Sequence, residues 1–302
     1  MAYRIVLIES ECSIYLKLKN LIINKGDGDI WIPLDDISMI VLDNLKIEFT
    51  VRLMSSLAEY NIGVIFCNMD HLPIGFYSSY DNHSRISKNI GYQIEKDSAF
   101  YDSFWREIVF EKISNQKKVL RILNKNTAEE KLIQLAKELK DGDPSNREAH
   151  AAKIYFNLLM GTSFSRGNED ILLNSGLDYG YSIIRSYIAR LCVGYGLNTQ
   201  LGIHHKNEFN RFNLVDDLME PCRPFVDLFA YNLLEKEEYF KIEHRRKLVN
   251  FLNHKVVYMD KKMFVGNMLE EYVSQYSAFL IGKRERVVFP NVDNYLGEKD
   301  AD

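Results

Sequence analysis

The chain contains three short segments whose side chains could bind a metal ion. The first surrounds Glu148, which follows an Asp-Pro pair of the kind that begins a helix. On that helix Glu148 shares one face with Tyr155 and Leu159, so its carboxylate points along an apolar stripe and needs a partner. The alternative is a capping box between Ser145 and Glu148, which would serve only the helix start.

The second segment holds His204 and His205 and follows a turn-like Tyr-Gly-Leu-Asn sequence. Histidine is a common ligand for divalent metals, so this segment is a candidate source of an imidazole ligand. Neither histidine has a second ligand at helical spacing, and an ordinary pair of surface residues is therefore the alternative.

The third segment places Asp217 and Glu220 three residues apart, so that both face the same side of a helical turn. Two carboxylates on one face attract a cation. The alternative is again a helix start, with Asp217 as the cap and Glu220 completing a capping box. Pro221 and Pro224 follow at once and bend the chain, which suits a rigidly placed site.

Carboxylate and imidazole groups from these segments form a donor set that suits Mg²⁺ or Mn²⁺. A thiolate site is not indicated, because Cys12, Cys67, Cys192 and Cys222 are scattered and form no C-x-x-C motif. The H-E-x-x-H motif of hydrolytic zinc enzymes is also absent from the sequence. We therefore expect buried, reduced cysteines and a metal held by oxygen and nitrogen.

The spacing of hydrophobic residues changes along the chain, from the alternation typical of strands to the spacing typical of helices, and so indicates which elements position these residues. Residues 1–78 have the pattern of a β-rich unit, with apolar and polar residues alternating near residues 14–19 and 30–34 and a Lys-Gly-Asp-Gly turn between two strands. One helix interrupts the strands, with Phe49, Leu53, Leu57 and Tyr60 on one face, before residues 62–67 resume as a buried strand. The pattern predicts a small sheet domain that carries one helix.

A polar, turn-prone stretch over residues 78–84 follows, and we assign 79–96 as a linker and the start of a helical region. From 97 to 288 apolar residues recur at helical spacing, as in Phe100, Phe104 and Ile108. Residues 289–302 end in an acidic stretch and are predicted to be a loose tail. The predicted fold class is α+β, with a β-rich domain followed by a larger, all-helical catalytic domain.

The composition excludes disordered and fibrous classes but few others. The chain has 302 residues, 46% of them hydrophobic and 26% charged, as expected for a globular protein of about two domains. No stretch approaches ~18 uninterrupted apolar residues and the N-terminus lacks a signal-peptide pattern, so we expect a cytoplasmic protein without a membrane partner. The net charge of −4 does not decide DNA binding, which needs only a local basic face.

The segment LGIHHKNEFNRFNLVDDLMEPCRP resembles the signature of the CRISPR adaptation integrases, the first family of CRISPR-associated proteins. In that family a G-x-x-H segment is followed twelve residues later by the Asp of a D-L-M-E-P-x-R-P run, as His205 is followed by Asp217 here. REAHAAKIY is similar to the helix that carries the family's upstream glutamate, and LDYGYSIIRSYIARLCVGYGLN to its long central helix. The details are most similar to the form that accompanies type II systems, although Cys222 stands where an aromatic residue is expected.

The resemblance extends over nearly the whole chain and implies both a fold and an activity. It implies a β-rich dimerisation domain and a helical catalytic domain, in which Glu148, His205 and Glu220 bind Mg²⁺ or Mn²⁺ and Asp217 is a further ligand or orients another. The implied activity is that of a metal-dependent DNA endonuclease and integrase, which inserts foreign DNA fragments into a CRISPR array by attack of a 3′-hydroxyl on repeat phosphodiesters. The implied partners are double-stranded DNA, a second copy of the chain, and a second CRISPR-associated adaptation protein that bridges two dimers.

DNA contacts would require basic and aromatic side chains on an accessible face. For any single residue the alternative is plain, because charged runs are usually solvated faces and helical tyrosines usually belong to the core. The candidates are Lys153, Arg166, Arg185, Arg190, Lys206, Arg245, Arg246 and Lys247 for phosphates, with Tyr179 and Tyr181 for bases.

Two other functions are compatible with the same residues. A stand-alone, structure-selective DNA nuclease would use the metal without an integration partner. A non-catalytic DNA-binding scaffold would use the acidic residues to hold a structural ion, or only to cap helices.

Overall fold

The N-terminal part of the chain consists of two four-stranded sheets and one helix. The structure is a computed structural model that describes residues 4–26, 28–80, 83–125, 129–168 and 171–298. The first sheet has the order β1-β5-β7-β8, in which β1, β5 and β7 are parallel and β8 is antiparallel to β7. The second has the order β4-β3-β2-β6. The strands are β1 (Arg4–Ile8), β2 (Ser13–Lys17), β3 (Asn20–Asn24), β4 (Asp29–Pro33), β5 (Ile37–Leu42), β6 (Glu48–Phe49), β7 (Gly63–Cys67) and β8 (Pro73–Tyr77), with a short 3-10 helix η1 (Leu34–Asp36).

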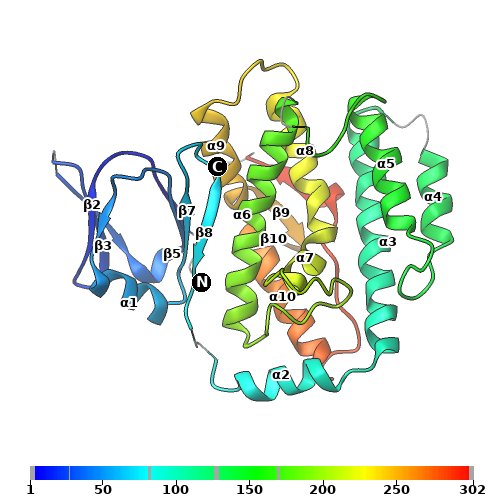
Figure 1. Cartoon of the computed structure of the whole chain (residues 1–302), viewed down its shortest axis with the longest axis horizontal. Helices are drawn as coiled ribbons and strands as arrows, with labels where there is room; N and C mark the ends of the chain where they lie inside the picture. Colours follow the sequence, from blue (N-terminus) through cyan, green and yellow to red (C-terminus); the bar gives the residue numbers. More distant parts are fainter. Residues whose placement is uncertain (1–3, 27, 81–82, 126–128, 169–170, 299–302) are drawn as a thin grey trace.

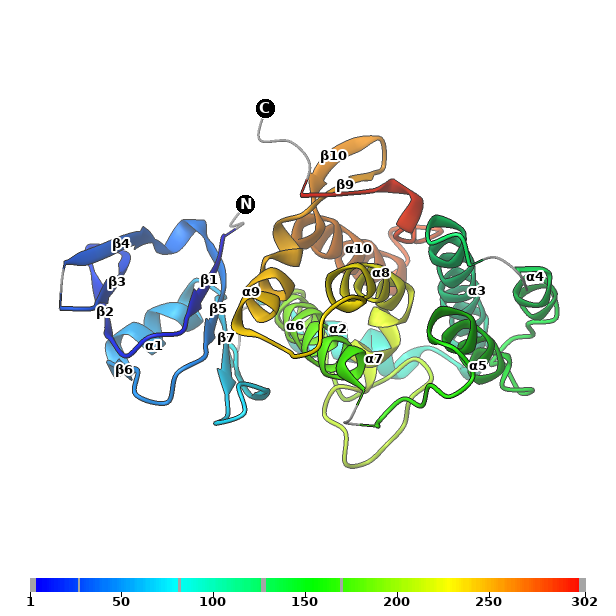
Figure 2. The same cartoon turned by 90° about the horizontal axis from the view of Figure 1, so that it is seen from above.

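Strand β5 joins the two hydrophobic cores of the molecule. All six of its residues are buried, because both faces of its sheet are covered. Ile40 and Leu42 pack into the core between the two sheets. Met39 and Val41, on the opposite face, belong to the core of the helical region. Figure 1 and Figure 2 show this sheet lying between the second sheet and the helices.

Helix α1 (Val51–Glu59) is the single helix predicted among the strands. Its N-cap is Thr50, whose hydroxyl accepts a hydrogen bond from the Leu53 N–H at 3.2 Å. Leu53 and Leu57 are buried as the spacing predicted. Phe49 was predicted on the same helical face but lies in β6, because the cap at Thr50 begins the helix after it.

The rest of the chain is mostly helical and is organised around the long helix α6. The helices are α2 (Ile86–Glu95), α3 (Ser98–Ile122), α4 (Glu129–Lys137), α5 (Arg147–Met160), α6 (Leu172–Gly194), α7 (Asn213–Met219), η2 (Glu220–Cys222), α8 (Arg223–Leu234), α9 (Ile242–Asn250), η3 (Phe251–Asn253) and α10 (Val265–Leu280). Helix α6 contacts α7, α8, α9 and α10 as well as β7 and β8. Gly180 lets α8 come close, since a Cβ there would lie 2.6 Å from Val226 Cγ1.

The prediction of an all-helical second domain was wrong. Strands β9 (Lys255–Tyr258), β10 (Lys261–Phe264) and β11 (Tyr295–Gly297) form a small sheet in the order β10-β9-β11. The predicted tail at 289–302 therefore includes an ordered strand, preceded by the 3-10 helix η4 (Val292–Asn294). These strands are three or four residues long and are stabilised by pairing between distant segments, so local periodicity does not reveal them. Residues 299–302 of the predicted tail lie outside the described residues.

Strands give way to helices between Tyr77 and Ile86, within the stretch that the sequence marks as turn-prone. Asp81 and Asn82 of that stretch, and Asp27 of the predicted β-turn, lie outside the described residues. In the part of the chain that the structure describes, no helix combines the length and the hydrophobicity needed to cross a bilayer. The four cysteines are buried and unpaired, as predicted.

Candidate metal centre

Glu148 lies in the first turn of α5, and other residues cap that helix. Asn146 is the N-cap, in the left-handed conformation, and the Asp143 carboxylate accepts hydrogen bonds of 2.9 Å from the N–H groups of both Arg147 and Glu148. The alternative of a capping box between Ser145 and Glu148 is therefore wrong. With the helix start already satisfied, the Glu148 carboxylate is free to turn toward a different partner.

Glu220 lies at the start of η2, directly after α7, and its side chain is only 5% exposed. Its Oε1 is 3.0 Å from Arg223 Nε, in an ion pair that the sequence analysis missed. Burial acts to raise the pKa of Glu220, but the positive charges of Arg223 and Lys112 outweigh it and hold that pKa below its ordinary value. Glu220 is therefore a buried carboxylate that keeps its negative charge.

Asp217 lies inside α7 and organises the loop that carries the histidines. Its fully buried carboxylate accepts hydrogen bonds from the N–H groups of Ile203 at 2.6 Å, His204 at 2.9 Å and His205 at 3.3 Å. The same carboxylate accepts a hydrogen bond from His205 Nδ1 at 2.5 Å. The helix-cap alternative for Asp217 is wrong, because Asp217 is not at the start of its helix.

His205, rather than His204, has the arrangement of a metal ligand. The hydrogen bond to Asp217 uses its Nδ1 and leaves Nε2 available, and a carboxylate behind the ring is the usual support of a ligating histidine. That hydrogen bond also raises the pKa of His205. The ring of His204 instead stacks on Trp105, with centroids 4.4 Å apart and planes 2° from parallel. The sequence analysis missed Trp105, which holds the loop from the side of α3.

The loop is also fixed at its beginning by α2. Gln93 Nε2 donates to the Asn198 carbonyl at 3.1 Å, and the Asn198 N–H donates to Gln93 Oε1 at 2.8 Å. Asn89 Nδ2 donates to the Tyr195 carbonyl at 2.9 Å. Three elements, α2, α3 and α7, therefore hold the segment that presents His205.

Lys112 of α3 connects the two glutamates and was not predicted. Its Nζ lies 2.5 Å from Glu148 Oε1 and 2.5 Å from Glu220 Oε2, and its side chain is 9% exposed. The sequence did contain a signal, because Lys112 continues the four-residue series of Phe104 and Ile108 along the buried face of the helix. A lysine in such a series needs an anionic partner.

The predicted ligands come from three separate segments, and Lys112 brings two of them, Glu148 and Glu220, together. The charges of Glu148 and Glu220 both act on His205 and raise its pKa, after the larger effect of Asp217. Glu220 Oε2 is buried and lies 2.5 Å from Lys112 Nζ. Two carboxylates and an imidazole suit Mg²⁺ or Mn²⁺ in donor chemistry. Among the described residues, however, no three such side chains are close enough to hold an ion as they stand.

Five arginines predicted to contact phosphates are engaged within the protein. Arg190 and Arg245 are buried, so their position contradicts the prediction of an accessible basic face there. The contacts are Arg166 with Asp178 (2.6 Å), Arg185 with Asp216 (2.6 Å), Arg190 with the Asn61 carbonyl (3.1 Å), Arg245 with Asp43 (3.3 Å) and Arg246 with Glu9 (2.6 Å).

Of the remaining residues predicted to contact DNA, the two tyrosines are buried and the three lysines are exposed. Tyr179 and Tyr181 are buried, and the Tyr181 hydroxyl donates to Asp227, so neither ring is available to stack on a base. This corrects the prediction, and the reason is that α6 is covered on most of its circumference. Lys153, Lys206 and Lys247 are exposed.

A polar groove of about 580 Å³ extends from His205 between α2 and the histidine loop. Its lining includes Lys96 and Lys206 together with several side-chain amides, those of Gln93, Gln200, Asn207, Asn210 and Asn213. Positive charges and amides suit the phosphates and base edges of a nucleic-acid strand. The groove therefore gives a route of approach to the imidazole.

A family model described as CRISPR associated protein Cas1 matches residues 5–255. The CRISPR-associated endonuclease Cas1 of Neisseria meningitidis serogroup C is 35% identical over 236 residues, which cover 78% of this chain and 77% of the relative. Among solved structures, a casposase bound to integration product has a TM-score of 0.79 at 18% identity and covers 99% of this chain and 96% of its own. A Cas6-RT-Cas1–Cas2 complex has a TM-score of 0.72 at 19% identity, over 93% of this chain and 35% of that one.

The family match includes the segments whose geometry was described above. The matched range covers the N-terminal domain from residue 5 and the helical region as far as residue 255, with the segments that carry Glu148, His205 and Glu220. At 18 and 19% identity the two solved structures show the fold alone, but the sequence relative and the family model establish kinship over most of the chain. The chain belongs to the Cas1 family of CRISPR-associated proteins.

Proposed function

We propose that this chain is a divalent-metal-dependent DNA endonuclease and integrase that inserts foreign DNA fragments into a CRISPR array. The observation that carries the proposal is that Lys112 joins Glu148 to Glu220 while the charges of both glutamates act on the Asp217-supported His205, although the three residues come from segments distant in sequence. A relative at 35% identity is named an endonuclease, and a structural neighbour is bound to an integration product. Both names agree with phosphodiester transfer at this site.

In this proposal Glu148, His205 and Glu220 hold Mg²⁺ or Mn²⁺. A bound ion supplies charge neutralisation at the phosphate and orients the attacking hydroxyl. The protein's own contribution is placement: Asp217 fixes the His205 ring through Nδ1, and Arg223 fixes Glu220 through Oε1. With water as nucleophile the outcome is cleavage, and with the 3′-hydroxyl of a captured fragment it is strand transfer into the repeat.

We further propose that DNA is held by the exposed lysines and by the polar groove beside His205. Lys153, Lys206 and Lys247 would contact phosphates. DNA affinity should then fall steeply with salt and survive chelation of the metal, because the phosphate contacts come from lysine whereas the ion serves the chemistry. Filter binding of double-stranded DNA from 50 to 300 mM salt, with and without EDTA, measures both. A salt-insensitive complex would remove the basic face from the proposal.

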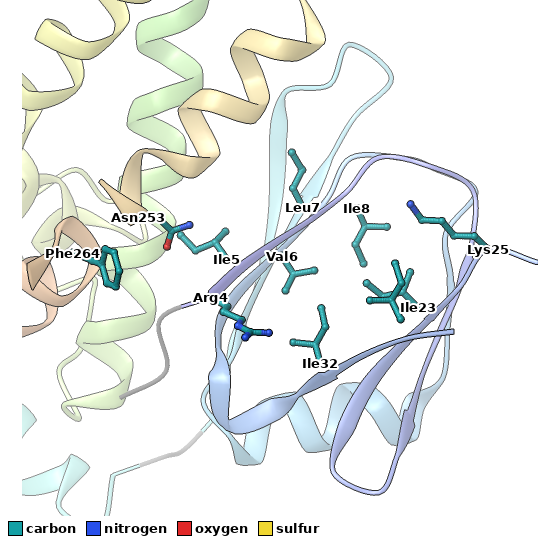
Figure 3. A pocket seen from close by; sticks show the side chains of 11 residues that line it. Arg4, Ile5, Val6, Leu7, Ile8, Ile23, Lys25, Ile32, Asn253 and Phe264 are labelled. Atoms are coloured by element: carbon teal, nitrogen blue, oxygen red, sulfur yellow. The ribbon is translucent and has the colours of Figure 1, made fainter. Parts of the chain in front are cut away.

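The partners in this proposal are a second copy of the chain and a Cas2 protein that bridges two dimers. A surface for the second copy is an apolar groove of about 520 Å³ that Figure 3 shows beside β1, between the N-terminal strands and Asn253 and Phe264 of the helical region. Its lining from the strands includes Ile5, Ile23 and Ile32, together with Ile30, which is 48% exposed. The name of the Cas6-RT-Cas1–Cas2 neighbour supports the Cas2 partner.

Light scattering tests the dimer. Ile30→Glu should convert the dimer to monomer, because a charge in an apolar interface loses its hydration. Ile122→Glu places the same charge on an exposed residue at the end of α3 and should leave the mass unchanged. If both variants keep the mass of the parent protein, the groove is not the dimer surface.

The decisive experiment for function is a strand-transfer assay with a labelled DNA fragment and a repeat-containing duplex, run with Cas2 in Mg²⁺ and Mn²⁺. Glu148→Ala, His205→Ala and Glu220→Gln should each abolish joined products while DNA binding persists. Joined products from any of these variants would remove that residue from the site. Cleavage without joining by the parent protein would instead favour a stand-alone nuclease, and loss of fold on chelation without any nicking would favour a scaffold.

A further inference from the structure

We propose that Lys112 is a built-in counter-ion of the metal centre: its ammonium occupies the place between Glu148 and Glu220 in the metal-free protein, and a divalent ion binds only by displacing it. Lys112 would thus set the metal affinity. This inference rests on the proposed function of Glu148, His205 and Glu220 as ligands, and it adds a residue that competes with the ion.

The contact geometry shows that the ammonium and an ion compete for the same atoms. Lys112 Nζ is 2.5 Å from Glu148 Oε1 and from Glu220 Oε2. Mg²⁺ requires carboxylate oxygens at about 2.0–2.1 Å, so an ion bound to these oxygens would overlap the ammonium. Displacing the ammonium would therefore free Glu220 Oε2 and Glu148 Oε1 together.

The charges explain why the lysine is needed without metal. Glu148 and Glu220 would otherwise repel each other where water is largely excluded, since their side chains are 23% and 5% exposed. The two positive charges of Lys112 and Arg223 balance the negative charges of the two glutamates, so the four side chains together are neutral. A divalent ion that enters this neutral group gains little attraction unless one positive charge leaves.

Lys112, and not Arg223, is the cation that can leave. Arg223 contacts the other oxygen of Glu220 and lies over the ring of Tyr181, 4.6 Å from its centroid, so its planar group is held on two sides. The Lys112 ammonium ends a flexible four-carbon stem that begins on α3. It can withdraw along that helix while α3 stays in place.

The test is Mn²⁺ binding by purified full-length protein, followed by the EPR signal of free Mn²⁺, together with thermal unfolding in EDTA and in Mn²⁺. Lys112→Met should bind Mn²⁺ at least ~10-fold more tightly, because the competing charge is gone. Its melting temperature should be lower than that of the parent protein in EDTA and should rise more when Mn²⁺ is added. Lys117→Met, on the same helix but paired with Glu129 at 3.7 Å, removes an equal charge away from the site and should change neither measurement.

Unchanged or weaker Mn²⁺ binding by Lys112→Met, with equal destabilisation in EDTA and in Mn²⁺, would overturn the inference and make Lys112 a structural ion-pair partner. Lys112→Gln provides a second neutral variant that can still donate a hydrogen bond to one carboxylate, and the same two readouts apply to it if the methionine variant does not fold. Absence of Mn²⁺ binding by the parent protein, or retained binding by Glu220→Gln, would count against the proposed ligands themselves. The two failures are therefore distinguishable.

Discussion

At the scale of single residues, Asp217 is the carboxylate that organises the loop carrying His205. It accepts hydrogen bonds from three consecutive backbone N–H groups and from His205 Nδ1, all while fully buried. These four donors satisfy the carboxylate and set both the backbone and the ring of the histidine. Asp217 is thus a positioning residue for His205, and its neighbour Asp216 has the separate task of pairing with Arg185.

Asp217→Asn should weaken Mn²⁺ binding and slow strand transfer by about 10 to 100-fold, because His205 loses its carboxylate support. It should also lower the melting temperature, since an amide matches four donors less well. Asp216→Asn is the matched control and should leave the Mn²⁺ affinity unchanged. Complete inactivity of Asp217→Asn beside an active Glu220→Gln would reverse the assignment of ligand and support, as parallel affinity and rate measurements would show.

Asp227 is a second buried carboxylate, and it makes the stability depend on pH. Burial raises its pKa to about 6, although the Tyr181 hydroxyl donates to it. A raised acid pKa means that the folded state binds the proton more tightly than the unfolded state. The stabilising contribution is therefore complete below the ordinary Asp value and is lost as pH rises through about 6.

Asp227→Asn should remove this dependence, because an amide is neutral throughout. Relative to the parent protein, its free energy of unfolding should increase by ~2 kcal/mol between pH 4.5 and pH 8, out of ~3 kcal/mol for the whole shift. Urea unfolding in EDTA at a series of pH values measures the difference. Asp178→Asn, at an exposed carboxylate, should run parallel to the parent protein, and a parallel curve for Asp227→Asn would disprove the shift.

At the scale of elements, α3 is the helix that assembles the centre. Within three turns it supplies Trp105 against the histidine loop, Lys112 between the glutamates and Asn115 against the segment after Glu220. Asn115 is fully buried, and its side-chain amide donates to the carbonyls of Pro221 at 2.9 Å and Pro290 at 2.8 Å. Its side-chain oxygen accepts a hydrogen bond of 3.1 Å from the N–H of Val292. One side chain thus joins α3, η2 and the C-terminal segment.

Asn115→Ala should reduce the free energy of unfolding by ~2–4 kcal/mol, because it leaves buried backbone groups without partners. It should also weaken Mn²⁺ binding, since Pro221 is covalently next to Glu220. Arg121→Ala, which removes a surface ion pair with Asp293 from the same helix, should have little effect on the free energy of unfolding and leave Mn²⁺ binding intact. Equal effects of the two variants would show that Asn115 does not hold η2.

At the scale of the whole molecule, α9 fastens the sheet domain to the helical region. Arg245 pairs with the buried Asp43 at the end of β5, His71 Nδ1 contacts the same carboxylate at 2.8 Å, and Arg246 pairs with Glu9 after β1. The basic residues Arg245, Arg246 and Lys247 were predicted to contact DNA, but two of them join the domains instead. Among the described residues, Lys247 is the one of these three that is exposed and forms no ion pair with the sheet domain.

Arg245→Met should lower the free energy of unfolding by ~3–5 kcal/mol, because it removes the arginine that pairs with the buried Asp43 carboxylate. Lys247→Met should have little effect. The double variant Arg245→Met, Asp43→Asn should recover part of the loss, since no uncompensated charge remains. Urea unfolding of the four proteins gives the comparison, and no recovery in the double variant would show that packing of the arginine stem, and not its charge, joins the domains.

The sequence by itself determined which regions form strands and which form helices. It also located most of the helices and identified the candidate ligands. Helical periodicity located α1 and α3, because each buries one face over several turns, and alternation located β2 and β4 of the second sheet. The resemblance singled out Glu148, His205 and Glu220 from isolated segments. Their spacing alone left capping boxes and surface histidines as alternatives.

Only the tertiary structure decided which of those alternatives holds and what surrounds the ligands. The caps of α5 at Asn146 and Asp143 are local contacts that settle the capping-box alternative. The pairing of β11 with β9 and the position of Lys112 between two glutamates join segments far apart in sequence. Exposure is decided in the same way, since Arg245 belongs to a basic run in the sequence and is nevertheless buried against Asp43. Local sequence reports which face of an element is apolar, whereas the partner of a buried charge is fixed by packing between elements.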